Sequence, residues 1–96
     1  MEASRENLTD EEIVKKVQLG GIEFFELLVQ RYQEKLGRYG KKFLSNSTDI
    51  EETVQEVFIK AYVNIKSFNT SQKFSSWIYR ISHNELVNAL KKKISR

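Results

Sequence analysis

The residues from Phe74 to Asn84 carry the side chains whose types and spacing best suit binding chemistry. At the 3.6-residue period of a helix, they divide into an apolar face and a basic, hydrogen-bonding stripe. The apolar face holds Phe74, Trp77, Ile78 and Ile81, and the stripe holds Lys73, Ser76, Arg80 and Asn84, continued by Lys91. Such a helix can bury one side and offer nucleic acid a cation, an amide and an aromatic edge on the other.

Single residues of this region have two interpretations each. Asn84 can hydrogen-bond a base edge in two directions, or make a local bond on the helix surface. Phe68 lies in a polar loop before the helix, where an exposed ring can stack on an unpaired base; alternatively, the ring folds back over the core. For Trp77, at the border of the two faces, we expect partial burial. Arg80 and the terminal lysines supply attraction for phosphate.

Catalytic and metal-binding chemistry have little support in the sequence. His83 is the only histidine and there is no cysteine, so a metal site lacks a second ligand of either type. Neither the Glu-x-x-His repeats of di-metal bundles nor a glycine-rich phosphate loop is present. We therefore expect no enzyme activity, no metal and no cofactor, and we expect His83 to be either a surface residue or a residue next to phosphate.

Length and composition indicate one domain, residues 1–96, with the charged and apolar fractions of an ordinary folded protein. The lack of cysteine fits a reducing compartment. No apolar run approaches the roughly 20 residues that span a membrane, and the N-terminus lacks a signal-peptide pattern. These features predict a cytoplasmic protein without membrane insertion.

The net charge of +3 is unevenly distributed. Residues 1–72 contain ten Lys/Arg and twelve Asp/Glu, whereas residues 73–96 contain six Lys/Arg and Glu85 as their only acid. A basic end can bind phosphate, but it also suits a solvated helix terminus. Charge alone does not choose between the two.

The absence of proline and the scarcity of glycine predict an all-α chain. We expect a compact bundle of about four helices. The first begins after Thr9, which forms a capping box with Glu12, and ends near Gly20, and the second covers about 22–44. The third covers 49–66 and is capped by Thr48 with Glu51, and the fourth covers about 72–93 and is capped by Ser71 or Thr70. Gly37 and Gly40 fall inside the second helix, where they either permit close approach of another helix or mark a bend.

The third expected helix has two distinct faces. One face is apolar and points inward: Ile50, Val54, Val57, Phe58, Ala61 and Ile65. The opposite face sets two aliphatic residues among polar ones: Glu52, Gln55, Glu56, Ile59 and Val63. This second face is either a contact surface for a partner or a surface covered by another helix, such as the first.

Two sequence runs carry a resemblance to a known family. They are Asp49-Ile-Glu-Glu-Thr-Val-Gln-Glu-Val-Phe-Ile-Lys-Ala-Tyr62 and, after Phe68, Lys73-Phe-Ser-Ser-Trp-Ile-Tyr-Arg-Ile-Ser-His-Asn84. Together, at this separation, they closely resemble the second conserved domain of bacterial sigma factors, nearest to the extracytoplasmic-function subgroup. The resemblance extends from about Thr9 to Lys93.

The resemblance implies two binding surfaces. The third helix would bind the clamp helices of the largest subunit of core RNA polymerase through Asp49, Glu52, Gln55, Glu56 and Ile59. The other surface would recognise and help melt the promoter minus-ten element by capturing a flipped base of the non-template strand. Its expected residues are Phe68, Asn69, Thr70, Ser71, Gln72, Lys73, Trp77, Arg80, Ile81, His83, Asn84 and Lys91. An anti-sigma factor is a further expected partner.

Some features depart from the wider family. Arg80 and Ile81 stand where housekeeping sigma factors carry an aromatic pair, which favours the extracytoplasmic subgroup. Residues 91–96 are expected to begin a basic linker, and no C-terminal helix-turn-helix domain follows in this sequence. We therefore expect an excised domain, a truncated product or a single-domain member. The alternative function is a protein-interaction module of sigma-like fold that docks on polymerase or an anti-sigma factor without reading DNA.

Overall fold

The computed structural model describes residues 5–95, with Glu6 described by its backbone alone. All regular elements in that range are helical, either α-helices or single 3₁₀ turns (η). In chain order they are η1 (Arg5–Asn7), α1 (Asp10–Gln18), η2 (Ile22–Phe24), α2 (Phe25–Gly40), α3 (Ser47–Asn64), η3 (Ile65–Ser67) and α4 (Phe74–Ile94). The expected all-α bundle with four main helices is confirmed.

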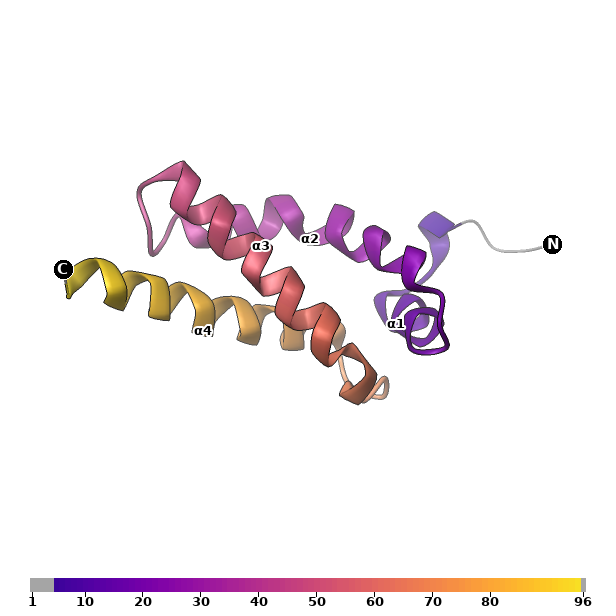
Figure 1. The fold of residues 1–96 in the computed structure, drawn as a ribbon. Coiled ribbons are helices and arrows are strands. Elements are labelled where there is room, and N and C mark those ends of the chain that lie inside the picture. The colour runs from indigo at the N-terminus through magenta and orange to yellow at the C-terminus, as the bar shows by residue number, and fades with distance from the viewer. Residues whose placement is uncertain (1–4, 96) are drawn as a thin grey trace.

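Three long helices form the body of the domain, and α1 closes one end of it. α2, α3 and α4 alternate in direction, and α3 packs against both of the others (Figure 1). The short α1 contacts α2, η3 and the start of α4 (Figure 1). The domain is elongated, measuring 54 × 23 × 20 Å along its principal axes.

The capping pattern confirms one expectation and corrects another. At α1, the Glu12 N–H donates to Thr9 Oγ1 at 3.1 Å and the Thr9 N–H donates to Glu12 Oε1 at 2.9 Å. The Thr9 bonds stabilise the charged carboxylate and lower the pKa of Glu12. At α3 the predicted Thr48–Glu51 box is wrong, because Asn46 Oδ1 accepts from the Thr48 and Asp49 N–H groups, so that the helix begins at Ser47.

α4 begins at Phe74, and the predicted side-chain cap from Ser71 or Thr70 is wrong. Its cap comes from another helix: the Phe74 N–H donates to Glu11 Oε2 of α1 at 2.8 Å. A carboxylate at this position satisfies a free N–H group and complements the positive end of the helix dipole. This bond ties the start of α4 to α1.

α2 is shorter than predicted. It begins after the 3₁₀ turn η2 and ends at Gly40, followed by a turn over residues 41–43, rather than continuing to residue 44. A Cβ at Gly40 would lie 2.9 Å from Ile50 Cγ2, so this glycine permits the close approach of α3. A Cβ at Gly37 would meet no atom within 4 Å, and close approach does not explain that glycine.

The core draws on all four α-helices. Its buried apolar residues include the whole predicted inner face of α3, which is thereby confirmed. The other buried apolar residues are Ile13, Val14, Val17, Leu28, Tyr32, Leu36, Leu44, Phe68, Phe74, Ile78 and Leu86. Tyr32 also hydrogen-bonds Asp10 of α1, and burial together with this bond raises the pKa of Tyr32 above its ordinary value. The packing of α1 on α2 thus combines apolar and polar contacts.

Candidate functional site

A pocket of about 320 Å³ lies between the end of α3 and the first turns of α4. Trp77, Ile81 and Asn84 form the α4 wall. Because they are spaced four and three residues apart, they fall on one flank of the helix. The structure thus brings together three of the residues predicted to bind DNA. The pocket combines an aromatic surface, an aliphatic surface and an amide, which suits a planar, hydrogen-bonding ligand such as a base.

The packing below the pocket fixes Trp77. Its ring lies 5.0 Å from the Phe68 ring and 5.7 Å from the Phe74 ring, measured between centroids. Trp77 is half-buried, which confirms the expected partial burial. The same contacts correct the first interpretation of Phe68. That ring is only 6% exposed, packed against Phe74 and Trp77, and it is not available to stack on a base.

The loop after Phe68 is folded by its own side chains and anchored by α1. Asn69 Oδ1 accepts from both the N–H and the hydroxyl of Ser71, and the Gln72 N–H donates to the Asn69 carbonyl. From α1, Gln18 Nε2 donates to the carbonyls of Ile65 and Phe68 at 2.9 Å each. The loop therefore has a defined shape at the edge of the pocket.

The predicted loop residues lie outside the pocket lining. Thr70 is partly buried, whereas Asn69, Ser71, Gln72 and Lys73 are exposed. These four polar side chains are accessible to a ligand that extends beyond the pocket. They remain predicted contact residues.

The other predicted DNA-binding residues on α4 are dispersed. Arg80 is exposed on the outer surface of α4, next to the pocket wall. His83 lies on the opposite flank, where its Nδ1 is 2.9 Å from the Tyr39 hydroxyl and its ring is 5.4 Å from that of Phe43. Lys91 is exposed seven residues beyond Asn84, about 10 Å along the axis. His83 and Lys91 are therefore separate from the pocket.

The sequence did not indicate the other lining residues, which are Lys60, Asn64 and Ser67 on the opposing wall and Glu85 on α4. Lys60 Nζ lies 2.7 Å from Glu85 Oε2, and this hydrogen bond raises the pKa of Lys60. The pair places a cation and an acceptor at the rim. Three of these four residues lie on α3 or η3, so their position depends on the register between α3 and α4, and no local pattern indicates it.

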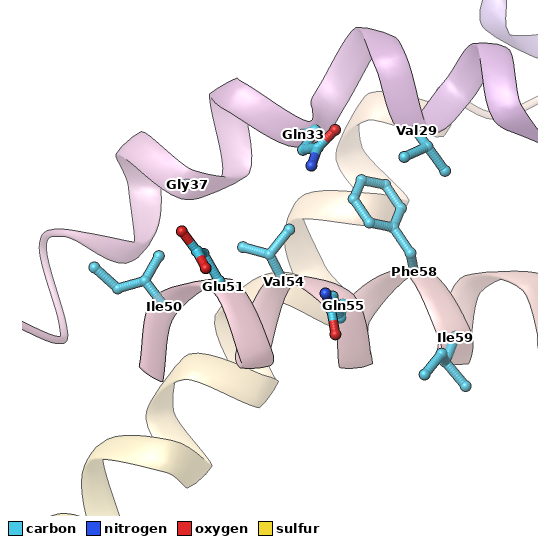
Figure 2. A pocket seen from close by; sticks show the side chains of 9 residues that line it. All are labelled: Val29, Gln33, Gly37, Ile50, Glu51, Val54, Gln55, Phe58 and Ile59. Carbon is cyan, nitrogen blue, oxygen red and sulfur yellow. The ribbon is translucent and has the colours of Figure 1, made fainter. Parts of the chain in front are cut away.

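A second, larger groove of about 560 Å³ lies between α2 and α3 (Figure 2). Two of the predicted polymerase-binding residues, Gln55 and Ile59, contribute to its lining. The remaining lining residues were not predicted as site residues: Val29, Gln33, Gly37, Ile50, Glu51, Val54 and Phe58. Figure 2 shows Val54 and Phe58 pointing toward α2, whereas Ile59 points away from it. The apolar floor and polar rim suit a protein partner.

The other predicted polymerase-binding residues lie around α3 rather than in this groove. Asp49 and Glu52 line a smaller hollow beside the end of α4, where Asp49 forms an ion pair with Lys93. Glu56 is exposed. Ile59 and Val63 are 56% and 72% exposed, so α1 does not cover them. The outer face of α3 is therefore open to a partner.

Within residues 5–95, no group of three metal-ligating side chains gathers. In the same range no helix has the length and apolar character needed to cross a bilayer.

Comparison with known proteins assigns this chain to a family. Residues 28–95 match sigma-70 region 2. The extracytoplasmic-function (ECF) RNA polymerase sigma-E factors of Haemophilus influenzae and Escherichia coli K12 are 45% and 42% identical over 85 residues, 88% of this chain. The ECF RNA polymerase sigma factor SigW of Bacillus subtilis is 39% identical over 80 residues, 83% of the chain. The chain spans 43–44% of the length of these relatives.

A solved structure shows the same fold. It is an engineered region 2 of sigmaE, determined by NMR in complex with GTAAAA. The two chains are 43% identical, each is covered over 92% of its length, and the TM-score is 0.84. On the family match and these identities, the chain belongs to the sigma-70 region 2 family, and its relatives are sigma factors of the extracytoplasmic-function type.

Proposed function

We propose that the chain acts in transcription initiation, where it docks on core RNA polymerase and captures one unpaired base of the non-template strand at the promoter minus-ten element. The observation that carries this proposal is the pocket in which Trp77, Ile81 and Asn84 meet, with Arg80 exposed beside it. The solved relative, in complex with GTAAAA, supports a nucleic-acid ligand for this fold.

Each group in the pocket has a role in this proposal. The Asn84 amide donates to and accepts from the edge of the captured base. Trp77 and Ile81 supply the apolar surface against which the base lies, and Arg80 attracts the flanking phosphate. Holding the base outside the duplex stabilises the melted state, because the base would otherwise pair and stack. Phe68 supports Trp77 from below rather than contacting the base.

The polymerase surface is the outer side of α3 with the α2–α3 groove. Ile59 and Gln55 line the groove, and Glu52 and Glu56 are exposed on α3 outside it, where they add negative charge. In this proposal these residues bind the clamp helices of the largest subunit, and the protein works in the cytoplasm without catalysing a reaction. The relatives' name, RNA polymerase sigma factor, supports this assignment.

A second candidate function is that of a protein-interaction module, which docks on polymerase or an anti-sigma factor without reading DNA. The exposed aliphatic side chains of Ile59 and Val63 favour it, because both lie on an open helix face. The two candidates differ in whether the isolated chain binds single-stranded DNA.

Titration with labelled single-stranded oligonucleotides of different sequence tests the proposal. We expect weak binding that falls as salt rises, since phosphate contacts release counterions. Asn84→Ala is expected to reduce discrimination between sequences by about 1–3 kcal/mol, with a smaller loss of general affinity. Asn88→Ala is the matched control, because Asn88 is exposed one turn further along α4 and lies outside the pocket. Absence of binding to every strand at low salt would favour the interaction module.

A further inference from the structure

The flank of α2 that faces away from the α2–α3 groove is strongly basic. Lys35 and Arg38 are three residues apart on one side of α2, and Lys42 follows them in the turn after the helix. All three are exposed and line a hollow of about 340 Å³ together with Tyr39 of α2 and Tyr79 of α4. This basic flank lies 30 residues or more before the basic end of the sequence, and neither binding surface described above includes it.

The cations of the basic flank have no acidic partners among the described residues. None of them belongs to the ion pairs found in residues 5–95, which involve Arg31, Lys60 and Lys93. Lys35 Nζ lies 5.3 Å from the centre of the Tyr32 ring, and Lys42 Nζ lies 5.7 Å from that of Tyr39. Ring contacts orient the two ammonium groups but leave their charge unneutralised.

The aromatic floor of the basic flank is held by contacts between its own rings. Tyr39 packs edge-on against Tyr79, with ring centroids 5.5 Å apart, and its hydroxyl bonds His83. Tyr39 and Tyr79 are both partly buried in these contacts. The rings therefore contact one another and Lys42, so a ligand would meet the cationic side chains and not open ring faces. This chemistry suits phosphate groups and not the stacking of bases.

The basic flank and the pocket proposed to bind a base lie on opposite sides of α4. Trp77, Ile81 and Asn84 lie on one side of this helix, Tyr79 lies on the other, and the exposed Arg80 lies between them. An α-helix with its side chains is about 10–12 Å wide, which is roughly three nucleotide rises of ~3.4 Å. A strand with one base in the pocket can thus cross α4 over Arg80 and reach Lys35, Arg38 and Lys42 within a few nucleotides.

We infer that this basic flank is a second DNA site, which binds the sugar-phosphate backbone of the same single strand that places a base in the pocket. The inference rests on the proposed function, because the captured base sets where the strand starts. The site reads no sequence. It adds affinity and holds the melted strand away from the α3 surface that polymerase is proposed to occupy.

The test compares a short oligonucleotide that covers only the pocket with strands extended by four nucleotides on the 5′ or the 3′ side. The variant is Lys35→Gln/Lys42→Gln, and the matched control is Lys15→Gln/Lys16→Gln on α1, which changes net charge equally. We expect one extended strand to bind the wild type more tightly than the short one. The double variant should weaken that strand about 25-fold at 0.1 M salt and reduce the slope of log K against log salt by about 1.4, since each single-strand phosphate contact contributes about 0.7.

Each outcome has a distinct meaning. Short-strand affinity should be equal in the variant, the control and the wild type. If the short strand binds but neither extension adds affinity, the second site is refuted while the proposed function stands. If no strand binds, the proposed function itself fails. If DNA binding is unchanged in the variant but binding of poly-glutamate is lost, the basic flank serves an acidic protein and the DNA inference is overturned.

Discussion

Replacing Gln18 by alanine is expected to loosen the loop before α4 and to destabilise the whole domain. Its Nε2 joins α1 to the carbonyls of Ile65 and Phe68, both at 2.9 Å and partly buried. The Ile65 oxygen also accepts the Phe68 N–H at 3.1 Å, whereas no other described hydrogen bond reaches the Phe68 oxygen. The substitution therefore removes two hydrogen bonds and leaves one carbonyl poorly satisfied.

The size of the effect follows from those two bonds. A neutral hydrogen bond contributes about 1 kcal/mol net, and a buried unpaired carbonyl costs about 1–3 kcal/mol. Because the site is only partly buried and water can reach the freed carbonyl, we expect Gln18→Ala to lower the free energy of unfolding by about 2 kcal/mol. In a domain of this length 1 kcal/mol corresponds to about 4–8 °C, so Tm should fall by about 8–16 °C.

Urea unfolding of the full chain, followed by far-ultraviolet circular dichroism, measures this change. The midpoint should fall while the m-value stays constant, as expected for lost stability without a change in exposed surface. Gln30→Ala is the control, because Gln30 is exposed on α2 and should change stability by less than about 0.5 kcal/mol. Equal midpoints for the two variants would refute the view that Gln18 holds the loop.

Three other predictions concern helix packing and the α3 surface. Gly40→Ala should destabilise the domain because the new Cβ would meet a neighbour at 2.9 Å, whereas Gly37→Ala, with open space, should stabilise it by up to about 1 kcal/mol; equal effects in thermal melts would contradict this. Ser82→Ala should stabilise by about 1 kcal/mol, since the hydroxyl is fully buried without a described partner, and a destabilised variant would count against this reasoning. Glu52→Lys/Glu56→Lys should weaken capture of core polymerase with helix content unchanged, and undiminished capture would exclude that surface.

Local patterns in the sequence predicted the parts of the fold that depend on neighbouring residues. The Thr9–Glu12 capping box needs contacts only three residues apart, and it was predicted correctly. The inner face of α3 follows from helical periodicity alone. The start of α4 could not be predicted in this way, because its cap is Glu11, 63 residues earlier in the chain.

The candidate site shows the same division. Helical spacing assigned Trp77 and Ile81 to the apolar face and Asn84 to the basic stripe beside it, whereas the family resemblance named all three as DNA-binding residues and the structure places them in one pocket. The opposing Lys60 and Asn64 required the register of two packed helices, which periodicity does not specify. For Phe68 the polar loop around it favoured exposure, but burying an aromatic ring against two others is worth more than leaving it in solvent.

The contacts of α1 show that the folded domain is larger than the segment that matches sigma-70 region 2. The sigma-70 region 2 match begins at residue 28, whereas Glu11 and Gln18, which hold the start of α4 and the loop, precede it. Ile13 and Val14 of α1 are also fully buried in the core. A fragment that begins at residue 28 would expose the surface these residues cover and release the loop from both anchors. The geometry of the pocket lined by Trp77, Ile81 and Asn84 therefore depends on a helix that contributes no residue to its lining.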